Sequence, residues 1–265
     1  MTELDVATAL DLLRHGEIDV QGRLVDASNA TLFCDIVADG TRAHCVYKPV
    51  AGERPLWDFP DGSLAGREVA AYTVSAAGSW GVVPPTVLRE GPFGPGMCQL
   101  WVDTDESVQL VDVLAPRAVP DAWRHVLDAL GSGGEPVVLA HADDARLRAM
   151  AVLDVVLNNA DRKGGHVLPG PDGVLRGVDH GVSFHVEPKL RTVLWGWAGE
   201  DLTGEETTQL SGLRAALDGS LGSELCDLLR PAEVTACTRR VDRLLREGHL
   251  PYPSEGWPAI PWPPF

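Results

Sequence analysis

Two polar loops, each carrying an aspartate, follow apolar segments in the second half of this sequence. Asp161 lies in Asn158–His166, after an apolar pattern with helical spacing, and Asp179 follows a short β-like run and precedes Gly181. Transfer of a phosphoryl group needs two such carboxylates, one to orient the attacking hydroxyl and one to hold a divalent metal on the phosphates. The sequence therefore favours a fold that brings both loops to one cleft.

The order of the expected elements predicts an α+β architecture with two lobes. We expect a strand-rich N-lobe over residues 1–102 and a helical C-lobe over residues 103–265, with a hinge near Trp101–Thr104. Periodicity and turn residues predict helices over 5–15, 64–77, 121–130, 143–158, 205–218 and 231–247, and strands over 20–24, 31–37, 43–48, 84–89, 97–102 and 174–178. Asp39-Gly40 is a strong signal for a hairpin turn.

The segment from Leu250 to Phe265 is rich in proline and cannot be helical. It is either a polyproline segment or an ordered strap. We expect the strap, because Trp257, Trp262 and Phe265 would be costly to expose to water.

Composition excludes several classes of partner. With 22 basic and 38 acidic residues the formal net charge is −16, which argues against nucleic-acid binding and against stable association with an anionic membrane. The five cysteines form no C-x-x-C pair, which is typical of reduced thiols rather than of disulfides or zinc. With neither a secretion signal nor an apolar run of about 18 residues, a cytoplasmic location is expected.

Lys48 and Glu68 lie twenty positions apart, at the end of a predicted strand and on the following predicted helix. A strand lysine paired with a helix glutamate is the arrangement by which kinases hold nucleotide phosphates. Each residue alone is more often a solvated surface residue. Ser28 and Asn29, in the turn between the first two strands, are a weak signal for backbone contacts to phosphate.

Asp154, inside the apolar helix, is expected to be a buried structural acid. The sequence holds no Walker A, zinc-protease or nucleophile-elbow motif. Trp195-Gly196-Trp197 could line a substrate site or pack in the core.

These motifs resemble the phosphoinositide-kinase-like branch of the atypical kinases, and in particular an actinobacterial family of about this length. Asn159-Ala160-Asp161-Arg162 is similar to the catalytic loop of that branch, and Asp179-His180-Gly181 followed by Phe184 is similar to its metal-binding motif. Weaker similarities cover residues 68–72 and 83–86. The resemblance implies a bilobal protein-kinase-like fold with ATP in the cleft.

The resemblance also assigns roles. It makes Lys48 the phosphate-binding lysine, Glu68 its partner, Asp161 the catalytic aspartate and Asp179 a metal ligand. It places the adenine-contacting hinge at residues 99–102, which include Gln99, Trp101 and Val102.

His166 departs from that pattern, because the branch has a metal-binding asparagine five residues after the catalytic aspartate. Magnesium prefers oxygen ligands, whereas imidazole suits softer ions such as manganese or zinc. Either His166 ligates a different metal, or Asp179 holds one metal alone, or the protein binds nucleotide without transferring phosphate. Lys163 could compensate by contacting the γ-phosphate as a point charge.

We therefore expect an ATP-dependent phosphotransferase that uses Mg²⁺ or Mn²⁺ and acts on an unidentified hydroxyl acceptor. Because the chain is strongly acidic, a protein or a small soluble molecule is favoured at least as well as an inositol lipid. The segment from His185 to Glu200 is the expected place of acceptor choice. The alternatives are a nucleotide-binding pseudokinase that serves as a regulatory module and an enzyme of the same fold that transfers AMP.

Overall fold

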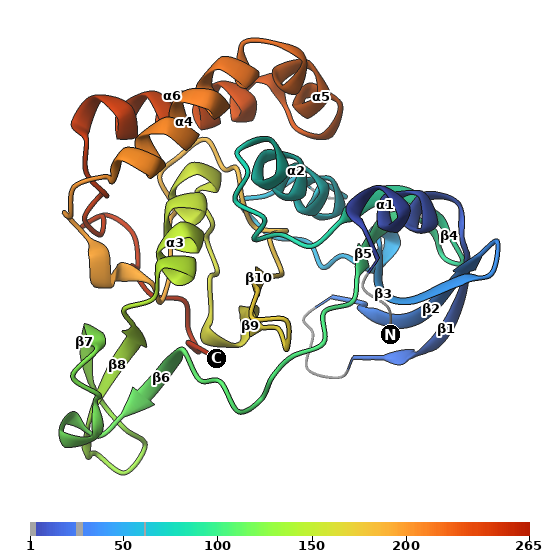
Figure 1. The fold of residues 1–265 in the computed structure, drawn as a ribbon. Coiled ribbons are helices and arrows are strands. Elements are labelled where there is room, and N and C mark those ends of the chain that lie inside the picture. The colour runs from blue at the N-terminus through green and yellow to red at the C-terminus, as the bar shows by residue number, and fades with distance from the viewer. Residues whose placement is uncertain (1–3, 25–28, 61) are drawn as a thin grey trace.

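The computed structural model describes residues 4–24, 29–60 and 62–265, and it confirms a mixed α+β fold. A five-stranded antiparallel sheet occupies one side of the molecule, and most of the helices gather on the other side (Figure 1). Ser28, named above as a weak phosphate-binding candidate, lies outside the described residues.

The large sheet has the strand order β1-β2-β3-β5-β4. Its strands are β1 (Glu17–Arg23), β2 (Leu32–Ala38), β3 (Thr41–Pro49), β4 (Thr86–Gly91) and β5 (Gly94–Leu100). The expected hairpin between β2 and β3 is confirmed, since Asp39 and Gly40 both have positive φ, 48° and 79°. Positive φ at both central residues is the requirement of a type I′ turn, which fixes the register of these strands.

Two helices accompany this sheet. Helix α1 (Val6–His15) begins at Asp5, whose carboxylate accepts from two backbone amides, and it buries Leu12 and Leu13 against Cys34 and Ile36 of β2. Helix α2 (Leu64–Ala77) ends at Gly78, as expected. Ala70, Ala71 and Val74 of α2 belong to the large core cluster of the second half, so this helix joins the two parts.

The second half is built around the long buried helix α3 (Ala145–Leu157), which starts at Asp144 and ends at Asn158 in a left-handed conformation. Around it lie α4 (Gly204–Leu217), α5 (Ser220–Leu228) and α6 (Pro231–Glu247), together with the short hairpin of β9 (Val167–Pro169) and β10 (Leu175–Gly177). The two aspartate loops flank this hairpin. None of the helices in the described ranges is both long enough and apolar enough to cross a bilayer.

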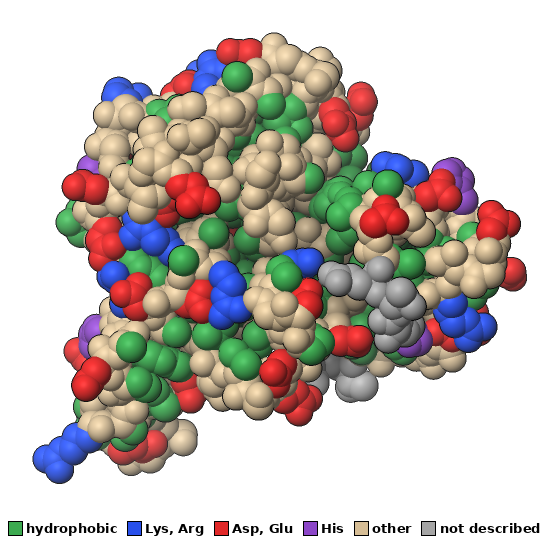
Figure 2. Space-filling view, viewed as in Figure 1, with side chains coloured by type: hydrophobic (Ala, Val, Ile, Leu, Met, Phe, Trp, Pro, Cys, Tyr) green, Lys and Arg blue, Asp and Glu red, His purple; other side chains and the backbone are tan. Residues whose placement is uncertain are grey.

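The prediction of a helix over residues 121–130 is wrong. These residues form β7 (Trp123–Leu130), which pairs with β8 (Pro136–Ala142) in a three-stranded sheet completed by β6 (Val111–Leu114). Val126, Leu127 and Leu130 do match a helical period, but Gly131, Gly133 and Gly134 turn the chain back as a hairpin. A bulge between His125 and Leu127 breaks the alternation typical of a strand. The first part of the expected helical lobe is therefore β-structure, and apolar side chains cover part of its surface (Figure 2).

The proline-rich tail lies against the body as an ordered strap. The amides of Gly164 and Thr192 donate to the carbonyls of Pro264 and Ala259, at 2.8 and 3.0 Å. The reason given for expecting a strap is only partly correct, because Trp262 is 83% exposed. Backbone hydrogen bonds hold this segment in place, so it does not need to bury every aromatic ring.

Candidate active site

The Lys48 ammonium joins three distant parts of the chain. Lys48 lies near the end of β3, and its Nζ is 2.7 Å from Glu68 Oε1 on α2 and 2.8 Å from Asp179 Oδ1 on the loop after β10. The amide of His180 donates to the other oxygen of Glu68 at 2.8 Å. The fold thus brings together the lysine, the glutamate and the second aspartate that the sequence singled out.

Burial and charge oppose each other in this cluster. Burial disfavours the ammonium of Lys48, but the carboxylates of Asp179 and Glu68 outweigh it and raise the pKa of Lys48. The Lys48 charge holds the pKa of Asp179 well below its usual range, whereas burial raises the pKa of Glu68. Asp179 is therefore ionised at neutral pH, and its side chain is 49% exposed toward the cleft.

Asp179 also has an unusual backbone. Its φ is 62°, in the left-handed region that residues other than glycine seldom adopt, although aspartate tolerates it better than most. This conformation turns the chain sharply between β10 and Gly181. Such strain is typical of residues held in place for a function.

Asp161 lies in the loop after α3, with its side chain 28% exposed. Its backbone amide donates to the side-chain oxygen of Asn159 at 3.0 Å, and Lys163 Nζ lies 3.6 Å from Asp161 Oδ2. Burial raises the pKa of Asp161, opposed by the positive charges of Lys163 and Arg191. The carboxylate has no close hydrogen-bond donor other than Lys163 among the described residues, which leaves it available to accept a proton.

Arg162 connects the two aspartate loops, a role that the sequence did not assign to it. Its fully buried guanidinium binds both oxygens of Asp154 at 2.9 Å, so Asp154 is the structural acid expected above. The same guanidinium donates to the carbonyl of Val178 at 3.1 Å and contacts His180 Nε2 at 2.6 Å. Arg162 thereby fixes the position of Asp161 relative to Asp179.

His166 lies where a metal ligand is expected. Its Nε2 is 3.5 Å from Asp179 Oδ2, and its Nδ1 is buried without a hydrogen-bond partner among the described residues. Burial lowers the pKa of His166 to about 4, so the ring is neutral at pH 7 and a nitrogen lone pair can bind a cation. One carboxylate and one imidazole suit manganese better than magnesium.

These two residues fit a divalent ion only with additional ligands. In the ranges the structure describes, no group of three or more His, Cys, Asp or Glu side chains could hold an ion by itself. The remaining ligands of a bound ion would have to come from other groups, such as water.

A cavity of about 530 Å³ lies between the two parts of the molecule and opens at this cluster. Of the residues expected to form the site, Asn29, Lys48, Glu68, Asp161, Lys163 and Asp179 line it. Asn29 also accepts a hydrogen bond from the amide of Arg54 at 2.9 Å.

The expected hinge residues are placed differently. None of the described residues that line this cavity comes from positions 99–102. Gln99 is buried and donates to the Thr86 hydroxyl at 2.8 Å, and Trp101 packs edge-on against Phe33. Val102 is half-buried. Their contact with adenine stays a prediction.

The chain has only three lysines, whereas the other nineteen basic residues are arginines, and each lysine lines this cavity or contacts residues that line it. Lys48 and Lys163 line the cavity. Lys189 Nζ lies 2.5 Å from Asp58 Oδ2, between the rings of Trp57 and Trp257, each 4.6 Å away. The loop before α2 and the strap thus meet the second half of the chain at Lys189.

Sequence reasoning missed the contribution of that loop and understated that of the strap. The sequence predicts no functional role for Trp57, Asp58 and Phe59 and only packing for Trp257 and Trp262. The structure shows that all five line the cavity. A tryptophan in a proline-containing loop and two more in a proline-rich tail were the available signal. Aromatic side chains in irregular segments often line binding sites.

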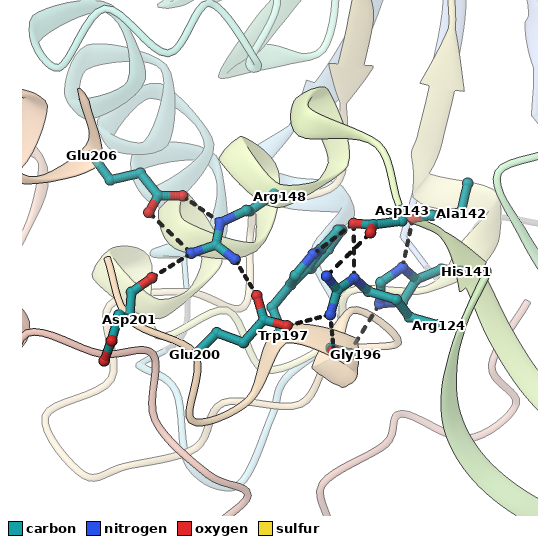
Figure 3. Close-up of polar contacts among 10 residues, drawn as sticks. All are labelled: Arg124, His141, Ala142, Asp143, Arg148, Gly196, Trp197, Glu200, Asp201 and Glu206. Atoms are coloured by element: carbon teal, nitrogen blue, oxygen red, sulfur yellow. Dashed lines mark hydrogen bonds and ion pairs between the residues drawn. The ribbon is translucent and has the colours of Figure 1, made fainter. Parts of the chain in front are cut away.

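A second charged cluster anchors the segment expected to choose the acceptor. We call it the anchor network: Arg124, Asp143, Arg148, Glu200 and Glu206 (Figure 3). Arg124 binds Asp143 with two nitrogens, at 2.8 and 3.1 Å, and also pairs with Glu200. Arg148 binds Glu200 at 2.6 Å and both oxygens of Glu206, at 2.8 and 3.2 Å.

The tryptophan pair at 195–197 belongs to this region and has a packing role. Trp197 is buried, and its indole donates to Asp143 at 3.1 Å, while Trp195 donates to the carbonyl of Ala259 in the strap at 2.9 Å. His141 accepts from the Gly196 amide at 3.0 Å. The end of the acceptor segment is therefore fixed to α3, β8 and the strap.

Comparison with known proteins gives a relative and a distant structural likeness. Protein Rv2133c of Mycobacterium tuberculosis is 50% identical over 263 residues, covering 96% of this chain and 94% of the relative. No family model matches the chain. A crystal structure of CtkA, a proinflammatory kinase of Helicobacter pylori, is similar with a TM-score of 0.44 and 11% identity, over 89% of this chain and 94% of that chain. A likeness this weak supports no inference about function.

Proposed function

This chain belongs to the family of the mycobacterial protein Rv2133c, and we propose that it is an ATP-dependent phosphotransferase acting on a hydroxyl acceptor. One observation carries the proposal. The Lys48 ammonium is held between Glu68 and Asp179, 20 and 131 positions away in the chain, at the mouth of a cavity that also contains Asp161. A partly buried lysine flanked by two carboxylates, one of them exposed to the cleft, is suited to bind phosphates together with a metal ion.

Each residue of the cleft has a task in the transfer. Asp161 accepts the proton of the acceptor hydroxyl, and the freed oxygen attacks the γ-phosphorus of ATP. The bond from that phosphorus to the bridging oxygen breaks, and ADP leaves with the electron pair. Lys48 and Lys163 neutralise phosphate charge, and Glu68 keeps the Lys48 ammonium directed into the cleft.

The proposed metal, Mg²⁺ or more favourably Mn²⁺, would neutralise charge that develops on the transferred phosphate. Asp179 and His166 would hold it. Arg162, which contacts both aspartate loops, keeps the base and the metal ligand in one arrangement.

Product formation from Mn·ATP tests the proposal. Asp161→Asn keeps the shape of the side chain and removes the base, so ADP formation is expected to fall by about 10²- to 10⁴-fold. Asp121→Asn, which removes an exposed carboxylate outside the cleft, serves as the matched control and is expected to leave the rate unchanged. Binding of a non-hydrolysable ATP analogue, measured as a rise in melting temperature, is expected to persist in both variants.

Other outcomes separate the alternatives. Nucleotide binding without turnover in the unsubstituted protein would mark a pseudokinase, and release of pyrophosphate in place of ADP would mark AMP transfer. If no nucleotide raises the melting temperature with either metal, the nucleotide proposal is wrong.

A further inference from the structure

Three tryptophans line the cavity that contains Asp161. Trp57 comes from the loop before α2, and Trp257 and Trp262 come from the strap. Trp57 and Trp262 are 86% and 83% exposed, which is unusual for the largest apolar side chain. Exposed aromatic rings around a concave site are typical of ligand recognition.

Arg191 lies between these three tryptophans, called the aromatic wall below, and the proposed base Asp161. Its amide donates to the carbonyl of Asn159 at 2.9 Å, and its Nε donates to the carbonyl of Ala160 at 2.6 Å. Ala160 directly precedes Asp161. The guanidinium carbon lies 5.5 Å from the centre of the Trp257 ring. A molecule that contacts both Arg191 and Trp257 therefore lies next to Asp161.

The two cations of this wall are in different electrostatic states. The ammonium of Lys189 is neutralised by Asp58. Arg191 has no carboxylate within ion-pair distance in the described part of the chain, and its charge acts on Asp161 only at longer range. Because Nε is used by Ala160, the two terminal nitrogens of Arg191 remain to bind a carboxylate or a phosphate group through two hydrogen bonds.

We propose that this end of the cavity binds the acceptor, and that the acceptor is a small hydroxylated ring compound carrying an anionic group. The ring lies against Trp257 and Trp57, the anion pairs with Arg191, and a ring hydroxyl faces Asp161. The inference rests on the proposed phosphotransferase function and specifies its substrate class. A cavity of about 530 Å³ suits a small molecule.

Two kinds of compound have this combination of a hydroxylated ring and an anion: sugar phosphates and hydroxylated aromatic carboxylates. Glucose 6-phosphate and 4-hydroxybenzoate are probes for these two sources. Glucose and phenol are the neutral counterparts. Binding is measured by tryptophan fluorescence with Mn²⁺ and a non-hydrolysable ATP analogue present, and phosphoryl transfer is measured as ADP release from ATP.

At least one anionic probe is expected to bind about tenfold or more tightly than its neutral counterpart and to stimulate ADP release. Arg191→Gln is expected to remove that preference while leaving the affinity for the neutral ring unchanged. Arg191→Lys keeps the charge but not the planar fork, so it is expected to retain part of the preference. Trp257→Leu is expected to weaken the binding of the charged and the neutral compounds alike.

Three results would each overturn the inference. They are equal affinity for charged and neutral rings, binding of neither ring class, and an Arg191→Gln variant that keeps the preference. If Arg191 only supports the catalytic loop, Arg191→Gln will weaken the binding of charged and neutral rings equally. That result would also overturn the inference. The melting-temperature shift with the ATP analogue is measured on the same samples. Loss of that shift in the unsubstituted protein contradicts the phosphotransferase proposal itself, so the two failures are distinguishable.

Discussion

The Lys48 cluster and the anchor network are both built from alternating charges, but they differ in how completely those charges are satisfied. In the anchor network, Arg124 and Arg148 each meet two carboxylates, and every buried side-chain atom that is described there has a partner. In the Lys48 cluster, Asp179 has a left-handed backbone, and the neighbouring His166 and His180 each have a buried ring nitrogen without a partner among the described residues. Exposure does not separate the two clusters, since Asp179 and Asp143 are 49% and 50% exposed.

The difference separates a structural cluster from a binding one. Buried polar groups are costly when unpaired, so a network that exists only for stability is expected to be satisfied in the free protein. A site that binds a charged ligand leaves part of its capacity unused until the ligand arrives. Matched substitutions in the two clusters test this comparison.

Lys48→Met is expected to have the largest effect. It removes the cation that contacts both Glu68 and Asp179, and ADP formation is expected to fall by about 10²- to 10³-fold, the cost of losing one positioned charge at the phosphates. The rise in melting temperature on adding an ATP analogue should fall or disappear. If the variant keeps both the rate of ADP formation and the rise in melting temperature, the proposal that Lys48 binds the phosphates is wrong.

Arg148→Met makes the same kind of change in the anchor network. It leaves Glu200 and Glu206 with fewer donors, and we expect the free energy of unfolding to fall by about 2 kcal/mol, or about 4 °C in melting temperature. Below the transition, turnover should stay within a few-fold of the unsubstituted protein. Arg243→Met, at an exposed pair with Glu247, is the control and should change stability by less than about 1 kcal/mol.

If Arg148→Met abolishes turnover while the protein remains folded, the distinction between the two clusters fails. The anchor network would then belong to the active site through its hold on residues 195–200.

His141→Gln is expected to have the smallest effect on turnover, and its distinguishing result is a change in the pH dependence of stability. Burial lowers the pKa of His141, and its neutral ring accepts from the Gly196 amide. A histidine whose pKa is lower in the folded state than in the unfolded state contributes stability that is lost as pH falls below its unfolded value, about 6.5.

Urea unfolding at pH 7.5 and at pH 5.5 measures this contribution. The loss of stability between the two pH values should be smaller in His141→Gln than in the unsubstituted protein. His15→Gln alters an exposed histidine and is the control for the substitution itself. Equal pH dependence in all three proteins would show that His141 does not couple protonation to folding.

Local signals in the sequence predicted much of the fold. The bounds of α2 and α6 match the expectation, because glycines follow both helices and Pro231 opens the second. Residues 121–130 were assigned wrongly because apolar spacing alone does not distinguish a bulged strand from a helix. Helix α5 was missed since it begins at Gly219 with no side-chain cap to mark it.

The residues of the site also fall into those that local sequence signals reveal and those that only the assembled fold reveals. Asp161 and Asp179 could be found because each stands in a recognisable local motif. The contact of Lys48 with Asp179 depends on chain folding over 131 positions, which no local pattern encodes. The bridging role of Arg162 and the approach of Trp57 to Lys189 are also long-range, so only the assembled structure contains them.

Two of the three lysines line the cleft and the third contacts tryptophans that line it, which makes the chain well suited to covalent footprinting. An amine-acylating reagent has only these three side chains and an N-terminal amine to react with. The side chains of Lys48 and Lys163 are 18% and 21% exposed, whereas that of Lys189 is 3% exposed. Mass spectrometry of the labelled protein would therefore report occupancy of the phosphate end of the cleft at Lys48 and Lys163, and displacement of Trp57 or the strap as new labelling at Lys189.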